Sequence, residues 1–206
     1  MSGVKDRVAL VTGAGSPEGI GFATARLLYS AGANIAITST TDRINERRDE
    51  IERTAVNVFS SAADLTDSTA VNTLIEQIEN ELGPIEIVIN NAGMVQIGRD
   101  EPSTLFHEVS DEQWHYGIDI NLTSAFMVTR AVLPGMMERN YGRIINISSV
   151  TGPSVGIAGS SVYSAAKAGM LGMTRSLAIE SGPNNVTVNC IGPGWIETAS
   201  LGDDEI

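Results

Sequence analysis

The stretch VALVTGAGSPEGIGFATARLLYSA, residues 8–31, decides the fold of this chain. It opens with an apolar run, Val8–Thr12, that is typical of a buried strand, and closes with helical spacing over residues 22–31. Between them lies a turn with glycines at positions 13, 15, 19 and 21. Glycines let a backbone approach a ligand closely, and the N–H groups that begin a helix attract negative charge. An ordinary glycine-rich turn is the alternative, but the order strand, turn, helix favours a site for the pyrophosphate of a dinucleotide.

The alternation of strand and helix continues along the chain. Apolar runs predict further strands at residues 35–38, 85–90, 143–148 and 186–191, with a weaker candidate at 56–62. Helical spacing lies between them, with apolar residues on one face at positions 71, 74, 75, 78 and 82. Such a pattern predicts the α/β class, with a Rossmann-type doubly wound parallel sheet and helices on both faces. Residues 1–206 should form a single dinucleotide-binding domain that also carries the catalytic site.

One long helix is expected in the second half of the chain. Ser110 and Gln113 form a capping-box pattern, and helical spacing continues from there past Phe126 toward Leu133. This places Asn121 inside a helix, where a polar side chain has little intrinsic reason to lie.

Charge and composition exclude several partners. The formal net charge is −12 and basic residues do not cluster, so nucleic acid is an unexpected partner. No apolar run approaches the length that spans a bilayer, so we expect a cytoplasmic protein with no membrane association. Cys190 is the only cysteine, which excludes an internal disulfide, and we interpret it as a small apolar residue of a strand. No metal site is expected.

The end of the second strand indicates which dinucleotide is bound. An acid there would bond the adenosine ribose and repel a 2′-phosphate, but this chain has Ser39 and Thr40, with Arg43 within reach. We therefore favour NADP(H), with NAD(H) possible. In the alternative interpretation, Thr41 and Asp42 merely cap the next helix and Arg43 is solvated.

Further motifs follow in order: residues 90–93 (NNAG), Asn121, the pair Ser148 and Ser149, residues 163–167 (YSAAK), and residues 193–194 (PG). With the glycine-rich turn, this set resembles the short-chain dehydrogenase/reductase family in its single-domain form, similar to 3-oxoacyl-acyl-carrier-protein reductases. The resemblance covers nearly the whole chain. The loop between Gly13 and Gly19 is enlarged relative to the family. Many family members that prefer NADP(H) have a basic residue just before the second glycine of the turn, where this chain has Glu18, so at this position the resemblance argues against NADP(H).

The spacing of Tyr163 and Lys167 has a chemical meaning of its own. Four residues on a helix put both side chains on one face, so an ammonium can lie near a phenol. A positive charge favours phenolate and lowers the pKa of tyrosine from about 10 toward neutrality. Tyr163 is therefore the expected general acid/base.

The resemblance implies the remaining site residues. Ser149 would hydrogen-bond the reacting oxygen, and Asn121 would hold a water that links Lys167 to solvent; a packing amide bonded to backbone is the alternative for Asn121. His107, His115 and Trp195 are expected to have no catalytic role, Trp195 being structural. Residues 94–107 and 153–162 should line the substrate pocket. The expected cofactor contacts are Gly13, Ser16, Gly19, Ile20, Gly21, Ser39, Thr40, Asp64, Leu65, Asn91, Ala92, Gly93, Tyr163, Lys167, Pro193, Gly194, Ile196 and Thr198.

These features predict an oxidoreductase that transfers a hydride between NADP(H) and a small ketone, 3-oxoacyl group or secondary alcohol. The alternatives are an NAD-dependent alcohol dehydrogenase of the same family and a dinucleotide-binding regulatory protein without turnover. The resemblance also implies a homodimer or homotetramer. Family members continue beyond the position of Ile206 with a further strand, so we expect a shortened chain in which the strand at 186–191 is an edge.

Overall fold

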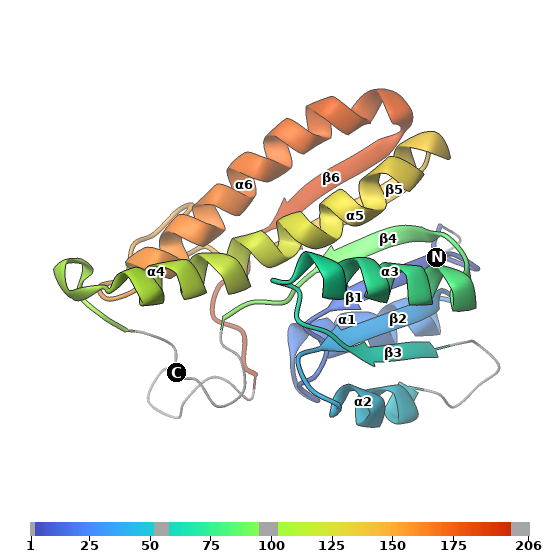
Figure 1. Cartoon of the computed structure of the whole chain (residues 1–206), viewed down its shortest axis with the longest axis horizontal. Coiled ribbons are helices and arrows are strands. Elements are labelled where there is room, and N and C mark those ends of the chain that lie inside the picture. Colours follow the sequence, from blue (N-terminus) through green and yellow to red (C-terminus); the bar gives the residue numbers. More distant parts are fainter. Residues whose placement is uncertain (1–2, 52–57, 95–102, 199–206) are drawn as a thin grey trace.

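The apolar runs form one parallel sheet in the computed structural model, which describes residues 3–51, 58–94 and 103–198 (Figure 1). The sheet order is β3-β2-β1-β4-β5-β6, so the order reverses between β1 and β4. Dinucleotides bind at such a reversal, outside the carboxyl ends of the strands. The strands are β1 (Val8–Thr12), β2 (Asn34–Ser39), β3 (Val58–Ala62), β4 (Ile85–Asn90), β5 (Gly142–Ile147) and β6 (Val186–Ile191).

These strands confirm the predicted fold class. Three have the predicted bounds, and β2 and β5 differ from them by one residue at each end. Residues 56 and 57 of the weaker candidate lie outside the described residues, and the rest of that candidate is β3.

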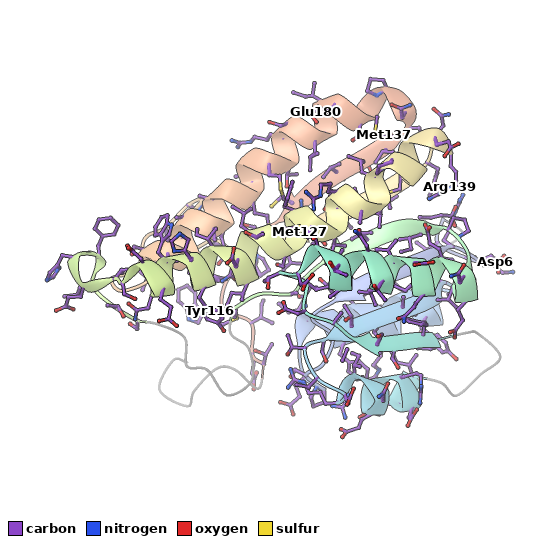
Figure 2. The ribbon with its side chains drawn as sticks, viewed as in Figure 1. Asp6, Tyr116, Met127, Met137, Arg139 and Glu180 are labelled. Carbon is purple, nitrogen blue, oxygen red and sulfur yellow. The ribbon has the colours of Figure 1, made fainter. Side chains whose placement is uncertain are left out.

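Helices cover the sheet on both faces, because each has one apolar stripe to bury. On one face α1 and α2 enclose a core with β1 and β2, and on the other α3, α5 and α6 pack over the sheet (Figure 1). Met127 and Met137 of α5, labelled in Figure 2, are partly buried against this second core. The helices are α1 (Ile20–Ser30), α2 (Ile44–Ile51), α3 (Ser68–Leu82), α4 (Asp111–Ile118), α5 (Ser124–Glu138) and α6 (Ser161–Ser181), with short turns η1 (Phe106–Glu108), η2 (Asp119–Thr123) and η3 (Gly182–Asn184).

The long helix predicted from Ser110 is interrupted, which corrects the sequence prediction. The capping box forms as expected and begins α4, but residues 119–123 make a π-helical turn before α5. The backbone N–H of Ser124 bonds to the carbonyl oxygen of Asp119, five residues back, and the Asn121 amide donates to the Gly117 carbonyl oxygen at 3.1 Å. The wider turn thus lies at Asn121, and π turns inside helices often mark functional sites.

The strand β6 forms one edge of the sheet within the described part of the chain. It pairs with β5 on one side only, and its alternate residues Thr187, Asn189 and Ile191 are exposed. This agrees with the expected edge. None of the helices in the described ranges is both long and apolar enough to cross a membrane.

Candidate active site

The glycine-rich turn is tied to the end of β4 by a small set of hydrogen bonds. The Thr12 hydroxyl accepts from the backbone N–H groups of Asn91 and Ala92, both at 3.0 Å. The Asn91 amide returns to the turn and donates to the carbonyl oxygens of Thr12 at 3.1 Å and Gly13 at 3.0 Å. Asn91 therefore shapes the turn and is already bonded to it.

Two glycines of the turn leave no room for a side chain. Gly13 has φ +67°, and a Cβ there would lie 2.7 Å from Ala92 Cα. A Cβ on Gly21 would lie 2.5 Å from the Asn91 side-chain nitrogen and 2.6 Å from the Gly13 carbonyl oxygen. Gly19 is the N-cap of α1, and Ser16 accepts its N–H through a backbone carbonyl. The helix thus begins directly behind the turn, where its N–H groups can meet a pyrophosphate.

The end of β2 brings a cation to the edge of this turn. A Cβ on Gly15 would lie 2.6 Å from Arg43 Nε and 2.8 Å from Ser39 Cβ. The Arg43 Nε is buried without a hydrogen-bond partner, and burial, followed by the charge of Arg47, lowers the pKa of Arg43. The N–H groups that begin α2 bond to backbone carbonyls, including that of Thr41. Arg43 is therefore a half-buried cation with an unused donor.

The other predicted adenosine contacts lie at the same edge of the sheet. Thr40 is exposed after β2, and the N–H of Ala63 bonds the Ser39 carbonyl oxygen, which brings the end of β3 alongside. The Asp64 carboxylate already accepts from the N–H and hydroxyl of Thr66. Leu65 is buried in the core, so only its backbone can face a ligand.

The first turns of α6 place Tyr163 and Lys167 on one face. Lys167 Nζ lies 5.6 Å from the centre of the Tyr163 ring and donates to the Ile147 carbonyl oxygen at 3.0 Å. Lys167 is 3 % exposed, and this burial lowers its pKa to about 8. An ammonium has three donors, so others remain for a ligand in the pocket. The two side chains have the geometry that their spacing predicted.

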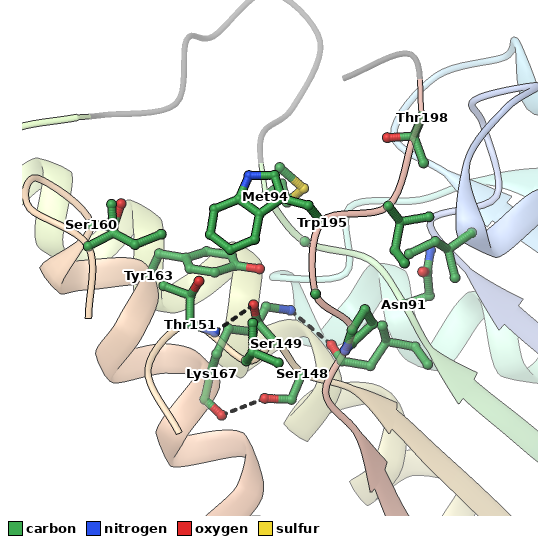
Figure 3. Close-up of a pocket in the computed structure, with 18 of the residues that line it drawn as sticks. Asn91, Met94, Ser148, Ser149, Thr151, Ser160, Tyr163, Lys167, Trp195 and Thr198 are labelled. Carbon is green, nitrogen blue, oxygen red and sulfur yellow. Dashed lines mark hydrogen bonds between the residues drawn. The ribbon is translucent and has the colours of Figure 1, made fainter. Parts of the chain in front are cut away.

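Ser149 follows β5 and faces Tyr163 across the pocket. Its hydroxyl oxygen accepts the Thr151 N–H at 3.0 Å, which leaves its own proton for another acceptor, and Figure 3 shows the Tyr163 hydroxyl pointing toward it. Ser148 instead donates to the Lys167 carbonyl oxygen at 2.8 Å. Ser148 thus anchors α6, whereas the Ser149 hydroxyl keeps a proton to donate.

Close packing holds α6 and the loops after β5 and β6 together. A Cβ on Gly152, which has φ +98°, would lie 2.3 Å from the Ser164 carbonyl oxygen of α6. The N–H of Val150 bonds the Pro193 carbonyl oxygen at 2.9 Å, which joins the loops after β5 and β6. The backbone segments that carry Ser149 and Tyr163 are therefore held close together.

The Asn121 side chain is bonded to backbone at both ends. Besides its bond to Gly117, its oxygen accepts the Met94 N–H at 2.8 Å. Gly93 passes between Asn121 and Lys167, because a Cβ there would lie 2.8 Å from Asn121 Oδ1 and 3.2 Å from Lys167 Nζ. The packing-amide interpretation fits this side chain, and the water relay stays a prediction.

A cavity of about 510 Å³ unites most of these groups. Among the predicted residues, Ser149, Tyr163, Lys167 and the later cofactor contacts line it, while the glycine turn, Ser39 and Asp64 lie along the same edge of the sheet and outside its wall. The expected substrate segments contribute as well, although residues 95–102 lie outside the described residues. The predicted cofactor contacts in the wall are Ile20, Asn91, Gly93, Pro193, Gly194, Ile196 and Thr198.

One residue of the wall was not foreseen from the sequence. Trp195, expected to be structural, is 60 % exposed and lines the cavity. Met94, in the segment predicted to line the pocket, also lines the cavity and has a left-handed conformation with φ 66°. The proline and glycine before Trp195 could have predicted this position, because they indicate that Trp195 lies in the loop after a strand. His107 and His115 are exposed and lie outside the wall.

Comparison with known proteins gives consistent matches. Residues 7–205 match the model of the family described as short chain dehydrogenase. The chain is 40 % identical to the 3-oxoacyl-acyl-carrier-protein reductase FabG of Vibrio harveyi, over 98 % of this chain and 80 % of the relative. It is 38 % identical to the hydroxy(phenyl)methylsuccinyl-CoA dehydrogenase subunit BbsD of Thauera aromatica, over 95 % of this chain and 75 % of the relative.

Solved structures agree with the sequence matches. A structure described as a short-chain alcohol dehydrogenase from Sinorhizobium meliloti superposes with a TM-score of 0.87 at 35 % identity. The match covers 99 % of this chain and 77 % of that one. A short-chain dehydrogenase/reductase structure from Burkholderia xenovorans gives a TM-score of 0.85 at 32 % identity.

Proposed function

Because this chain belongs to the short-chain dehydrogenase family of oxidoreductases, we propose that it reduces a ketone with NADP(H), using Tyr163 as general acid. One observation carries the proposal: the Tyr163 phenol, the Ser149 hydroxyl and the Lys167 ammonium line one cavity at the point where the strand order reverses. A carbonyl oxygen between the two hydroxyls would accept hydrogen bonds from both.

The residues of the chain divide the chemistry between them. A bound nicotinamide supplies the hydride for the carbonyl carbon. The Tyr163 phenol gives its proton to the carbonyl oxygen as negative charge develops there. Ser149 donates a second hydrogen bond to that oxygen and holds it in place. The Lys167 ammonium, 5.6 Å from the phenol ring, favours the phenolate that results. In the oxidising direction Tyr163 removes the alcohol proton.

The residues at the edge of the sheet fit a dinucleotide with a 2′-phosphate. The glycines at 13 and 21 leave a turn that no Cβ can fill, directly before the N-terminus of α1, which suits a pyrophosphate. Arg43 lies against Gly15 and Ser39, and its buried Nε has no hydrogen-bond partner. A phosphate there would satisfy the orphaned donor and offset the repulsion from Arg47. Glu18, which argued against NADP(H), is exposed.

Replacing Arg43 tests the choice of cofactor. Charge-assisted hydrogen bonds contribute about 1.5–3 kcal/mol, so Arg43→Ala should weaken NADPH binding by roughly 10- to 150-fold. NADH, which lacks the phosphate, should bind the variant and the parent equally. Arg48→Ala is the matched control, since Arg48 lies on α2, which begins directly after Arg43, and pairs with Asp49. Titration of nicotinamide fluorescence measures both cofactors, and an equal loss for NADH and NADPH would contradict the assignment.

Replacing Tyr163 separates catalysis from a purely regulatory role. Tyr163→Phe should lower kcat for ketone reduction by about 10²- to 10⁴-fold while NADPH binding is kept. Tyr141→Phe is a suitable control, because the Tyr141 ring stacks between Arg7 and Arg143 and lies outside the cavity wall. A Tyr163→Phe protein with full reductase activity would exclude the proposed mechanism.

The relatives guide the search for substrates and partners. Their names describe a 3-oxoacyl reductase and a dehydrogenase of a hydroxy(phenyl)methyl group, both of which interconvert an alcohol and a ketone.

We also propose that the chain forms a homodimer or homotetramer through α5 and α6. These helices expose Phe126 (41 %) and Ile179 (79 %), and Figure 2 shows that side chains of both helices lie along the outer surface of the molecule. Sedimentation of the purified chain measures this.

A further inference from the structure

The cavity has an apolar mouth that the chemistry of Tyr163 and Ser149 does not use. Trp195, Met94 and Ile157 line the cavity and are 60 %, 41 % and 40 % exposed. Large apolar side chains left open to water around a cavity are typical of a ligand-binding surface. A role in the core is excluded for Trp195 by its exposure.

Trp195 is directed at the reacting groups. Figure 3 shows its indole extending from the loop after β6 toward α6, on the side where the Tyr163 hydroxyl lies, with the ring nitrogen pointing away from that hydroxyl. The loop itself is anchored, because the Pro193 carbonyl oxygen accepts the Val150 N–H. The Trp195 indole thus borders the part of the cavity where a group attached to the carbonyl carbon would lie.

Met94 is held at the same mouth by Asn121. A non-glycine residue at φ 66° is unfavourable, and the bond from its N–H to Asn121 Oδ1 at 2.8 Å supports this conformation. A methionine sulfur makes favourable contacts with aromatic rings, so the Met94 thioether suits an aromatic group of a substrate. Asn121 therefore acts as a positioning residue for a side chain of the substrate pocket.

The rest of the described wall does not provide for a charged substrate. Lys167 is the only residue with a charged side chain among the described residues that line the cavity, and it is 3 % exposed beside Tyr163. The other wall residues near α6 are small and uncharged, such as Ala158 and Ser160. The described wall accordingly favours a neutral group, which its apolar mouth can contact.

We propose that Trp195 and Met94 form an aromatic clamp, and that the preferred substrate carries an aromatic ring on its carbonyl carbon. This rests on the proposed reductase function. The clamp makes Trp195 a specificity-determining residue. Stacking on the indole favours binding of a flat aromatic ring over an alkyl chain with the same number of carbon atoms.

Kinetics with two matched ketones test the clamp. Acetophenone and methyl hexyl ketone have the same number of carbon atoms, and the parent protein should prefer acetophenone in kcat/KM. Trp195→Leu keeps an apolar side chain without the π face, so it should reduce that preference by about 2- to 12-fold, and Trp195→Phe should restore most of it. Trp114→Leu is the control, because Trp114 is the other tryptophan and lies outside the cavity wall. An unchanged preference in Trp195→Leu would overturn the clamp and leave the reductase function standing.

A binding measurement separates the clamp from turnover. In the double variant Trp114→Phe, Tyr163→Phe, Trp195 is the only tryptophan left, so its fluorescence reports the cavity directly. With NADP⁺ present, α-methylbenzyl alcohol should change this fluorescence at lower concentration than sec-octyl alcohol does. If this holds while the parent reduces neither ketone, the clamp stands and the proposed reaction fails. Equal titration by the two alcohols would refute the clamp.

Discussion

Lys167→Met should make the cofactor-free protein more stable while it abolishes catalysis. Lys167 is 3 % exposed, and burial lowers its pKa from an ordinary 10.5 to about 8. That difference means that the charged lysine costs the folded state roughly 3 kcal/mol. Methionine has similar length without the charge, but it also loses the charge-assisted bond to the Ile147 carbonyl oxygen, which contributes about 1.5–3 kcal/mol. The net gain near neutral pH is therefore between about 0 and 1.5 kcal/mol.

The pH dependence of the stability shows whether the charge of Lys167 causes the difference between the variant and the parent. Below about pH 8 lysine is protonated in both states, so the full cost is present. Between about pH 8 and 10.5 the folded protein has lost this proton and the unfolded chain still binds it, so the stability of the parent rises with pH. The advantage of Lys167→Met should accordingly shrink across this window.

Urea unfolding at fixed protein concentration measures the effect, at about pH 7 and again at about pH 10. Lys5→Met is the matched control, because Lys5 is exposed and is the only other lysine of the chain. A difference between Lys167→Met and the parent that stays constant across this range would refute the reasoning, as would a variant less stable than the parent at the lower pH.

Two further changes probe the supports of the site. Thr12→Val removes the acceptor shared by the N–H groups of Asn91 and Ala92. The free energy of unfolding should therefore fall by about 1–3 kcal/mol, and NADPH should bind more weakly. Thr24→Val, a control on the outer part of α1, should leave NADPH binding unchanged. Asn121→Ala removes the acceptor of the Met94 N–H. Steady-state kinetics should then show a larger rise in KM for the ketone than for NADPH. The reverse order would count against the role of Asn121 as a positioning residue.

Much of this protein follows from local sequence patterns. The strands, the glycine-rich turn before α1 and the capping box at Ser110 are readable because each depends on neighbours within a few residues. The pairing of Tyr163 with Lys167 follows from helix geometry alone. These interactions are short-range, so the periodicity and spacing of the residues contain them.

The interruption at Asn121 and the contacts of Arg43 were decided by tertiary structure. The π turn forms where the Asn121 side chain bridges Gly117 and Met94, which are brought together only when α4 packs beside the loop after β4. Arg43 reaches Gly15 because β1 and β2 pair in parallel and end at the same edge of the sheet. No local pattern records such distances.

Sequence by itself therefore determined the fold class and the residues able to perform the chemistry, because strand and helix periodicity and the side chains themselves are local properties. Tertiary structure alone decided what surrounds them. It buried Lys167 enough to lower its pKa, and it left the Trp195 side chain at the cavity mouth instead of in the core. Burial depends on every element packed around a residue, and that sum is known only once the chain has folded.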